Sequence, residues 1–405
     1  MVNTPNIQFL NRTTPPHVST LVLISGLAAL AMNIFLPSLP GMTTYFRTDY
    51  RVMQLSVAIY LGVNAVVQIL IGPISDKFGR RPVLLWGIVL FLVATLGCIL
   101  APNVEVFLFF RMAQAVISVA MVLSRAAVRD MYPQDKAASM IGYVTMGMAI
   151  VPMIGPAIGG ALDEVFGWKA NFWMLMLLGI ICLWLVWADL GETACESART
   201  LREQFGEYPE LLKSPRFWGY AMAAAFNSGA FFAYLGGAPF VGTEVFGLSA
   251  SQLGIFFGAP AIGYILGNFL AGRYSIKFGL NRMVLWGCLI NVIGTAMSLC
   301  IFIFGFGTVY FFFGFTVFVG IGNGMTIPNA TSGMLSVRPH LAGTAAGLGG
   351  ALMIGGGAML SALAGSLLAP GTGALPLLLL MFTTSAFGVI FILFVLWRQR
   401  QLTQF

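Results

Sequence analysis

Two arginines, Arg111 and Arg125, lie within one long apolar segment of the chain. Charged side chains in such segments are costly and usually functional, and a guanidinium matches a carboxylate with paired N–H donors. Positions 111, 118 and 125 repeat every seven residues, which predicts that Arg111, Ser118 and Arg125 share one helix face. The arginines would stand about 21 Å apart, one toward each end of a polar track. The alternative is that each reaches back to its nearer end of the segment.

The segments around these arginines are too apolar for a soluble protein. Of the 405 residues, 58% are hydrophobic and only 9% are charged, whereas soluble domains carry about a quarter charged residues. Runs of about 20 apolar residues are typical of membrane-spanning helices. The sequence therefore predicts an all-α integral membrane protein. We expect its first run, from Ser19, to be kept as a helix rather than removed as a leader.

Twelve such runs are present, in two groups of six. A polar linker at 191–215 separates a predicted bundle at 1–190 from a second at 216–405, and its mixed charges at helical spacing predict an amphipathic helix. The predicted spans are 19–41, 54–75, 82–101, 105–128, 138–162, 170–190, 216–241, 250–272, 283–304, 307–336, 341–366 and 374–397.

The basic residues are distributed unevenly among the loops. With the amino terminus in the cytoplasm, sixteen of the 21 Lys and Arg residues fall on the cytoplasmic side, and Arg47, Arg51 and Lys169 fall outside. This bias follows the positive-inside rule, and it predicts that both termini lie in the cytoplasm. It also accounts for most of the net charge of +7, so nucleic acid is not an expected partner.

An internal repeat relates the two halves. GPISDKFGRRPVLLWG at 72–87 aligns with GRYSIKFGLNRMVLWG at 272–287, and half of the positions are identical. Each copy joins the second and third spans of its half, so the halves are parallel repeats of one six-span unit. Two such bundles enclose a cavity at the membrane midplane and rock about it. The repeat therefore predicts a transporter that works by alternating access.

Several motifs resemble those of one transporter family. The copy at 72–82, GPISDKFGRRP, resembles the loop signature of the major facilitator superfamily, and FRMAQA at 110–115 resembles the arginine motif of its fourth helix. GMAIVPMIGPAIGG at 147–160 resembles the fifth-helix motif of its drug-exporting branches. AMNIFLPSLP at 31–40 and SRAAVRDMY at 124–132 are similar to the bicyclomycin/chloramphenicol-resistance branch, whose members are proton-coupled drug exporters. The resemblance implies the superfamily fold of two six-helix bundles, an antiport mechanism and a location in a bacterial inner membrane.

Two of these motifs are predicted to control the conformation. The motif at 72–82 would form a charged latch on the cytoplasmic side, with a tight turn at its glycines; the alternative is a loop that only fixes topology. The motif at 147–160 has small residues that let the fifth helix pack closely and seal the cavity; ordinary packing is the alternative. The predicted gate residues are Gly72, Asp76, Gly79, Arg80, Arg81, Arg129, Asp130, Gly155, Pro156, Gly159 and Gly160.

A residue for proton coupling is not apparent. All fourteen carboxylates lie in loops or at the ends of spans, although a proton antiporter normally has a titratable group in its cavity. The related branch usually has an aspartate where this chain has Asn33, which does not titrate. Glu244 and Asp130 remain as candidates, and neither lies at the centre of a span.

The predicted substrate site is cationic or neutral. Its residues are Asn33, Tyr60, Arg111, Gln114, Ser118, Arg125, Asn227, Tyr234 and Asn268. Because none of these side chains is anionic, we expect neutral or anionic amphipathic substrates and discrimination against organic cations.

Other functions remain open from the sequence. One is a carrier of an anionic metabolite, such as a carboxylate siderophore or an organic acid, in either direction; a more distant one is a non-transporting membrane receptor. The chain shows no nucleophile–base pair and no metal-ligand spacing among its five cysteines, so we expect no enzyme activity, cofactor or metal. The expected partners are a small-molecule substrate, protons and the lipid bilayer, with the protein as a monomer.

Overall fold

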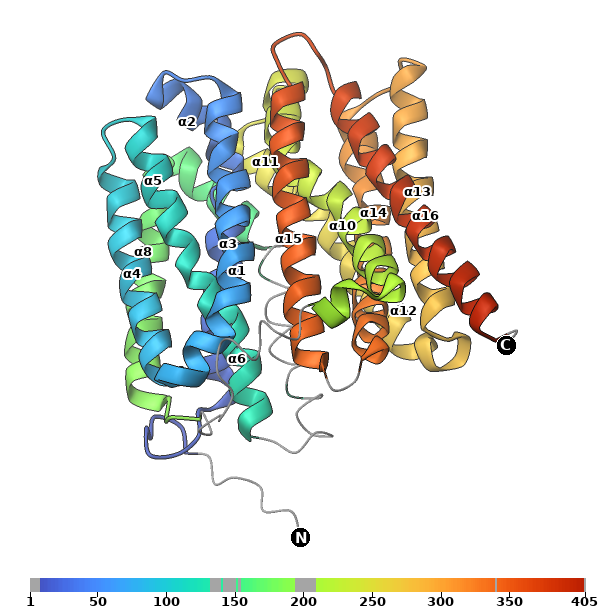
Figure 1. Ribbon diagram of the computed structural model, residues 1–405. Helices are drawn as coiled ribbons and strands as arrows, with labels where there is room; N and C mark the ends of the chain where they lie inside the picture. Colours follow the sequence, from blue (N-terminus) through green and yellow to red (C-terminus); the bar gives the residue numbers. More distant parts are fainter. Residues whose placement is uncertain are drawn as a thin grey trace.

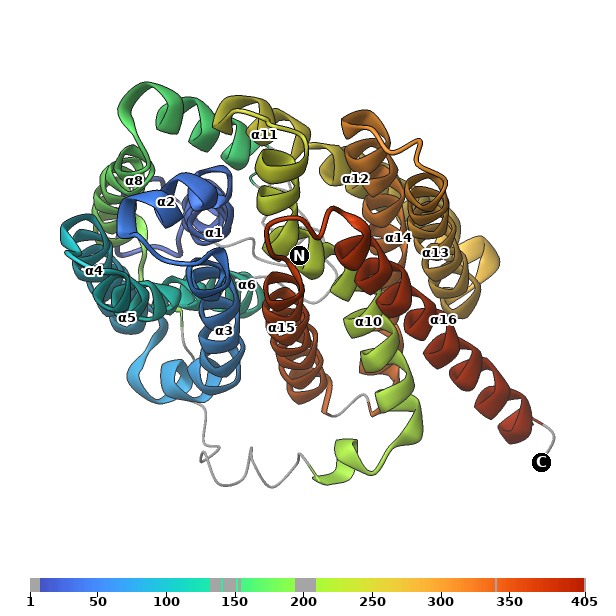
Figure 2. The same ribbon diagram turned by 90° about the horizontal axis from the view of Figure 1, so that it is seen from above.

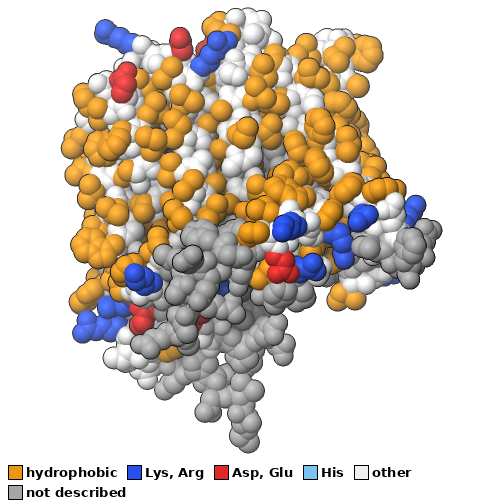
Figure 3. All heavy atoms as spheres, viewed as in Figure 1, with side chains coloured by type: hydrophobic (Ala, Val, Ile, Leu, Met, Phe, Trp, Pro, Cys, Tyr) orange, Lys and Arg blue, Asp and Glu red, His pale blue; other side chains and the backbone are white. Residues whose placement is uncertain are grey.

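The computed structural model describes residues 8–131, 140, 151, 154–193, 209–338 and 341–403. Within these ranges the chain forms helices and no strand. Ten helical segments in the described part are long and apolar enough to cross a membrane. Hydrophobic side chains cover the middle of the molecule, and the coloured charged side chains lie toward its two ends (Figure 3). The predicted all-α membrane fold is confirmed.

The first half begins with a helix that is interrupted by prolines. Pro37 lies in the 3-10 turn η1 and Pro40 in the first turn of α2, because proline lacks the N–H that a continuous helix requires. The beginning of the predicted span 138–162 lies outside the described residues. The helices of this half are α1 (Val18–Asn33), η1 (Leu36–Ser38), α2 (Leu39–Phe46), α3 (Tyr50–Phe78), α4 (Arg80–Leu100), α5 (Val104–Gln114), η2 (Ala115–Ile117), α6 (Ser118–Met131), a helix at 154–166, and α8 (Lys169–Asp189).

The second half contains one helix that is less apolar than the rest. This helix, α10, is rich in alanine and glycine and is buried over most of its length, so it needs no apolar surface toward lipid. The predicted amphipathic helix of the linker falls mainly on residues 194–208, outside the described part. The helices of this half are α10 (Pro215–Phe240), the π-helical turn η3 (Val241–Val245), α11 (Ala250–Phe256), α12 (Ala259–Phe278), α13 (Leu280–Ile303), α14 (Val309–Val337), α15 (Ala342–Leu367) and α16 (Leu375–Thr403).

Polar side chains in the loops start several of these helices. The Asn103 side chain accepts a hydrogen bond from the first turn of α5, and the Thr308 side chain does the same for α14. Ser249 and Gln252 form a reciprocal capping box at the start of α11. These caps satisfy backbone N–H groups that would otherwise lack partners, and they fix the residue at which each helix begins.

The two halves stand side by side, with α3 packed along α15 (Figures 1 and 2). We call the end where α1 begins and α16 ends the terminal side, and the opposite end the far side (bottom and top of Figure 1). The two copies of the repeat form equivalent turns on the terminal side. Gly79 and Gly279 have φ values of 89° and 84°, which side chains with a Cβ rarely adopt.

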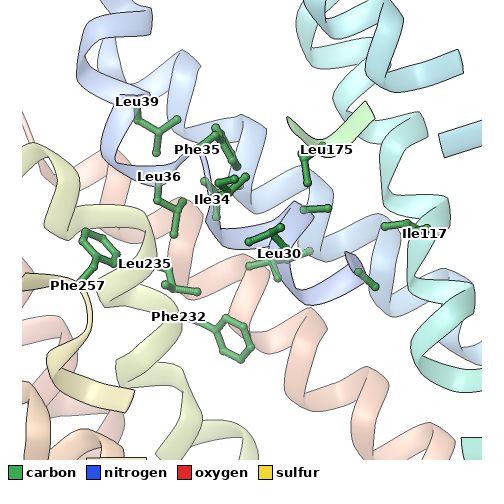
Figure 4. Packing of buried hydrophobic residues seen from close by; sticks show 14 of the residues in the cluster. Leu30, Ile34, Phe35, Leu36, Leu39, Ile117, Leu175, Phe232, Leu235 and Phe257 are labelled. Atoms are coloured by element: carbon green, nitrogen blue, oxygen red, sulfur yellow. The ribbon is translucent and has the colours of Figure 1, made fainter. Parts of the chain in front are cut away.

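A buried apolar cluster joins the halves. Leu30, Ile34 and Leu36 from the first half lie near Phe232 and Leu235 of α10 (Figure 4). In a membrane such packing is stabilised by van der Waals contact rather than by removal from water. The cluster therefore holds the halves together where α1 ends and the 3-10 turn begins.

Candidate functional site

A cavity of about 230 Å³ lies between the two halves. Its wall has three phenylalanine rings and four polar side chains, and no lining side chain is charged. Such walls suit ligands with a large apolar surface and few polar groups. The first half contributes Asn33 and Pro156. The second half contributes Ser228, Phe231, Phe232, Leu235, Phe257, Pro260, Ala261, Tyr264, Gly320, Asn323, Ile327 and Met353.

Asn33 is the predicted site residue that reaches the cavity from α1. Its Nδ2 donates to the carbonyl oxygen of Ala29 at 3.1 Å. Its Oδ1 is buried and has no hydrogen-bond partner in the described structure. A buried acceptor without a partner is costly, so this oxygen is available to a ligand that carries a donor group.

Asn227, also predicted from the sequence, lies one layer behind the cavity. Its Nδ2 donates to Oδ1 of Asn323 at 2.8 Å, and its own Oδ1 accepts from Asn291 Nδ2 at 3.0 Å. Ser385 Oγ donates to Asn291 Oδ1 at 3.2 Å. This chain of hydrogen bonds crosses four helices and holds Asn323 in the cavity wall.

Tyr234 and Asn268 are likewise adjacent to lining residues. The buried ring of Tyr234 packs against Phe257 with centroids 4.9 Å apart, while the next residue, Leu235, lines the cavity. Asn268 donates to the carbonyl oxygen of Tyr264 at 2.8 Å. The three lining phenylalanines were not among the predicted site residues, although Phe231 and Phe232 stand out beside polar residues in an alanine-rich helix.

Arg111 is buried inside the first half and does not line the cavity. Its Nη2 donates to the carbonyl oxygen of Ala31 at 2.9 Å and its Nε to that of Ser56 at 3.4 Å. Its Nη1 donates to Oε1 of Gln114, whose Nε2 donates to Thr95 Oγ1 at 2.8 Å. The guanidinium therefore ties together α1, α3 and α5.

Two aromatic rings complete the surroundings of Arg111. The guanidinium carbon lies 4.2 Å from the ring centroid of Phe35 and 4.1 Å from that of Tyr60. Cation–π attraction is strongest in desolvated sites of this kind. The hydroxyl of Tyr60 is buried and has no partner in the described structure, so the ring is the part of Tyr60 that contacts Arg111.

The predicted track from Arg111 through Ser118 to Arg125 is not a single exposed face. The 3-10 turn at 115–117 rotates the chain about 60° more than three α-helical residues would. Ser118 is buried, and Arg125 is exposed. Arg125 Nε donates to the carbonyl oxygen of Met121 at 3.2 Å.

Hydrogen bonds between described residues of the two halves gather at the far side. The hydroxyl of Tyr50 on α3 donates to the carbonyl oxygen of Gly236 on α10 at 2.8 Å. Gln54 Nε2, one turn further along α3, donates to the carbonyl oxygen of Ser361 on α15 at 2.6 Å. These bonds close the far-side end of the cavity.

Glycines allow the helix at 154–166 to join this closure. A Cβ atom at Gly159 would lie 1.7 Å from the carbonyl oxygen of Ile34 in the first half. A Cβ atom at Gly160 would lie 2.1 Å from that of Ala250 in the second. Gly155 packs more loosely, since its Cβ would lie 3.0 Å from a methyl group of Leu30.

The latch residues form a network within the first half, on the terminal side. Arg80 Nε pairs with Asp130 Oδ2 at 3.2 Å, which joins the start of α4 to the end of α6. The carboxylate of Glu192 accepts from the backbone N–H groups of Arg80 at 2.8 Å and Arg81 at 3.3 Å. Arg81 Nη2 donates to the carbonyl oxygen of Trp187 at 3.0 Å. Glu192 was not among the predicted gate residues, although its place just after the sixth span puts it beside them.

Four predicted gate and coupling residues remain. The carbonyl oxygen of Gly72 accepts from Ser75 Oγ at 2.8 Å, and Ser75 Oγ in turn accepts from Arg80, so Gly72 adjoins the latch network. The side chain of Asp76 lies outside the described part of the structure. Arg129 is exposed at the end of α6, and Glu244 is exposed in η3 on the far side. Neither lines the cavity.

Comparison with known proteins identifies the family. The model of the Major Facilitator Superfamily matches residues 21–362. A chloramphenicol resistance protein of Pseudomonas aeruginosa is 31% identical, over 83% of this chain and 82% of that protein. A bicyclomycin resistance protein homologue of Haemophilus influenzae is 27% identical, over 88% and 90%.

Solved structures show the same fold at lower sequence identity. The D-xylose–proton symporter superposes with a TM-score of 0.75 at 16% identity, over 93% of this chain and 96% of that one. At this identity the likeness concerns the fold alone, and it agrees with the match to the family model and with the resistance proteins. The chain is therefore a member of the Major Facilitator Superfamily, in the branch that contains the chloramphenicol and bicyclomycin resistance proteins.

Proposed function

We propose that this protein exports neutral or anionic amphipathic small molecules, such as antibiotics, in exchange for protons. The observation that carries the proposal is the cavity between the halves, whose wall is aromatic and aliphatic and contains no carboxylate. The names of the two resistance proteins support the same substrate class. Organic cations would find no anionic partner on this wall.

Three polar side chains of the first half have distinct roles in this proposal. Oδ1 of Asn33 accepts a hydrogen bond from the substrate, and Arg125, exposed on α6, receives its anionic or electron-rich group. Arg111 already has three acceptors and two rings around it. Its role is to keep α1, α3 and α5 in register rather than to contact the substrate.

In this proposal the structure represents a state that is closed on the far side. Tyr50, Gln54 and the glycines of helix 154–166 join the two halves there. Basic residues prevail on the terminal side, which the positive-inside rule places in the cytoplasm. We therefore place both termini in the cytoplasm, with the protein in a bacterial inner membrane acting as a monomer.

Proton coupling is assigned to the latch in this proposal. Asp130 is paired with Arg80, and a proton on its carboxylate would remove the charge attraction between α4 and α6. Glu244 is exposed on the far side, away from the network. Proton binding at Asp130 would therefore change how firmly the first half is held at its cytoplasmic end.

Flux into proteoliposomes with an imposed pH gradient tests the proposal. The substrates to compare are chloramphenicol as a neutral drug, tetraphenylphosphonium as an organic cation, and a polycarboxylate. We expect gradient-driven, saturable chloramphenicol flux and little flux of the cation. Saturable transport of tetraphenylphosphonium at the same rate would contradict the assigned substrate class.

Arg125→Gln separates binding of an anionic group from transport itself. We expect it to weaken transport of an anionic amphiphile about tenfold and to change chloramphenicol flux much less. Arg51→Gln, at an exposed arginine on the far side that is not among the predicted site residues, is the control and should resemble the unmodified protein. Equal effects of both variants would remove Arg125 from the site.

A further inference from the structure

The second copy of the repeat borders a groove on the outer surface of the second half. The groove has a volume of about 600 Å³, lies between α12 and α13, and has Met325 of α14 at its base. It shares no lining residue with the central cavity. Exposed apolar side chains continue along both helices, including Phe269 on α12 and Ile293 on α13. The groove therefore faces the hydrocarbon of the membrane.

Aromatic rings form the terminal-side end of this groove. The ring of Phe278 lies 5.0 Å from that of Trp286 and 5.9 Å from that of Tyr274, between centroids. The ammonium group of Lys277 lies 5.4 Å from the centroid of Phe278. Tryptophan and tyrosine are typical of the level where lipid headgroups meet the hydrocarbon. This end of the groove thus combines the aromatic surroundings and the positive charge of a headgroup site.

The basic side chains beside the groove have no acidic partner in the described second half. Arg273, Lys277 and Arg282 are exposed. The carboxylates of residues 209–338 and 341–403 are those of Glu210 and Glu244. The first pairs with Arg338 at 2.9 Å, and the second lies on the far side.

The first copy of the repeat uses its arginines differently. Arg80 and Arg81 are held by Asp130, Glu192 and a backbone carbonyl group within the first half. At the corresponding positions the second copy has Leu280 and Asn281, and its cations instead stand at the lipid-facing groove. The second copy therefore lacks the charged network of the first. Asn281 instead accepts a hydrogen bond from the hydroxyl of Tyr220 at 2.6 Å, and the positive charge of this copy stands at the membrane surface.

We propose that this groove binds one anionic phospholipid. Lys277 and Arg282, on either side of the turn at Gly279, receive the phosphate and the anionic headgroup, and an acyl chain lies along Trp286 and Leu270. Each basic residue near a membrane surface contributes attraction to anionic lipid, and basic recesses between spanning helices bind such headgroups. The proposal depends on the membrane location of the protein and not on the nature of its transport substrate.

Native mass spectrometry of the purified protein tests the site. The lipids are 1-palmitoyl-2-oleoyl phosphatidylglycerol and the matching phosphatidylcholine, which differ in headgroup charge and share their acyl chains. We expect the unmodified protein to bind the first phosphatidylglycerol at least tenfold more tightly than phosphatidylcholine. Lys277→Ala combined with Arg282→Ala should remove this difference. The control is Arg51→Ala combined with Lys169→Ala, two basic residues on the far side, and it should keep the difference.

Fluorescence quenching by brominated acyl chains locates the lipid. Brominated phosphatidylglycerol should quench part of the tryptophan emission, and Trp286→Phe should remove that part. Because Lys277 and Arg282 are exposed, thermal unfolding should be unchanged in the variant with alanine at both positions, which separates loss of the lipid from loss of the fold. Equal binding of the two lipids, binding unaffected by the double substitution, or displacement by inorganic phosphate alone would overturn the proposal.

Discussion

Gly160 packs directly against the carbonyl group of Ala250, across the boundary between the two halves. A Cβ atom at Gly160 would lie 2.1 Å from that carbonyl oxygen, so a side chain there forces helix 154–166 away from α11. Backbone atoms cannot move aside as a flexible side chain can. The closure of the far side therefore depends on the absence of a side chain at this position.

Gly160→Ala should leave the far side partly open. In a variant without native cysteines, we expect Ser228→Cys, in the cavity wall, to react several-fold faster with a membrane-impermeant maleimide added to intact cells. Transport should fall about tenfold. Gly62→Ala is the matched control, because no atom lies within 4 Å of a Cβ at Gly62. If both alanine variants behave alike, close packing at Gly160 does not seal the cavity.

Tyr60 should be insensitive to loss of its hydroxyl and sensitive to loss of its ring. The hydroxyl has no partner in the described structure, whereas the ring faces Arg111 at 4.1 Å. We expect Tyr60→Phe to keep the melting temperature in detergent within about 2 °C. Tyr60→Leu should lower it clearly, because a desolvated cation–π contact contributes about 2 kcal/mol. A large loss in Tyr60→Phe would show that the hydroxyl does have a hydrogen-bond partner.

Arg111→Lys should destabilise the first half although the charge is kept. A lysine ammonium is a point charge and cannot reproduce the fork that reaches Ala31, Ser56 and Gln114. Leaving buried acceptors unpaired costs about 1–3 kcal/mol each. We expect a melting temperature below that of Tyr60→Leu. A stable Arg111→Lys protein with impaired transport would instead indicate direct contact with the substrate.

The sequence predicted where the helices lie better than how they are rotated. Long apolar runs and the repeat at 72–87 and 272–287 depend on composition and spacing, and the structure has helices at the corresponding places. The cavity wall depends on rotation about each helix axis, which changes by about 100° per residue. The sequence therefore predicted Asn227 and Tyr234 as site residues, whereas the next residues along the chain, Ser228 and Leu235, line the cavity.

Breaks within helices were the other feature that patterns did not show. The 3-10 turn at 115–117 contains no proline or glycine to mark it. Its extra rotation means that Arg111 and Arg125 do not share one face of the segment. The role of Arg111 depends on contacts with Ala31 and Ser56, far away in the sequence. Such contacts follow from the assembled bundle and not from local composition.

Asn33→Asp should change the charge preference of the cavity. The substitution puts a carboxylate, in place of the amide with the free Oδ1, on a wall that otherwise has no charged side chain. We expect flux of tetraphenylphosphonium to appear and to decrease at low pH, because protonation neutralises the new carboxylate. Asn33→Ala removes the amide without adding charge and should not transport the cation. Cation flux in both variants would show that shape, and not charge, excludes organic cations.

Asp130→Asn should uncouple transport from the pH gradient. Asparagine has nearly the same size as aspartate but carries no charge and takes up no proton, so the attraction between Asp130 and Arg80 at 3.2 Å is lost at every pH. We expect gradient-driven accumulation of chloramphenicol to fall at least tenfold, while exchange of labelled for unlabelled substrate continues without a gradient. Glu210→Gln is the control, because Glu210 also pairs with an arginine, Arg338, but in the second half and with about half of each side chain exposed. Accumulation that still follows the gradient in Asp130→Asn would place the coupling proton elsewhere. Loss of both accumulation and exchange would assign the Arg80–Asp130 pair to the conformational change itself.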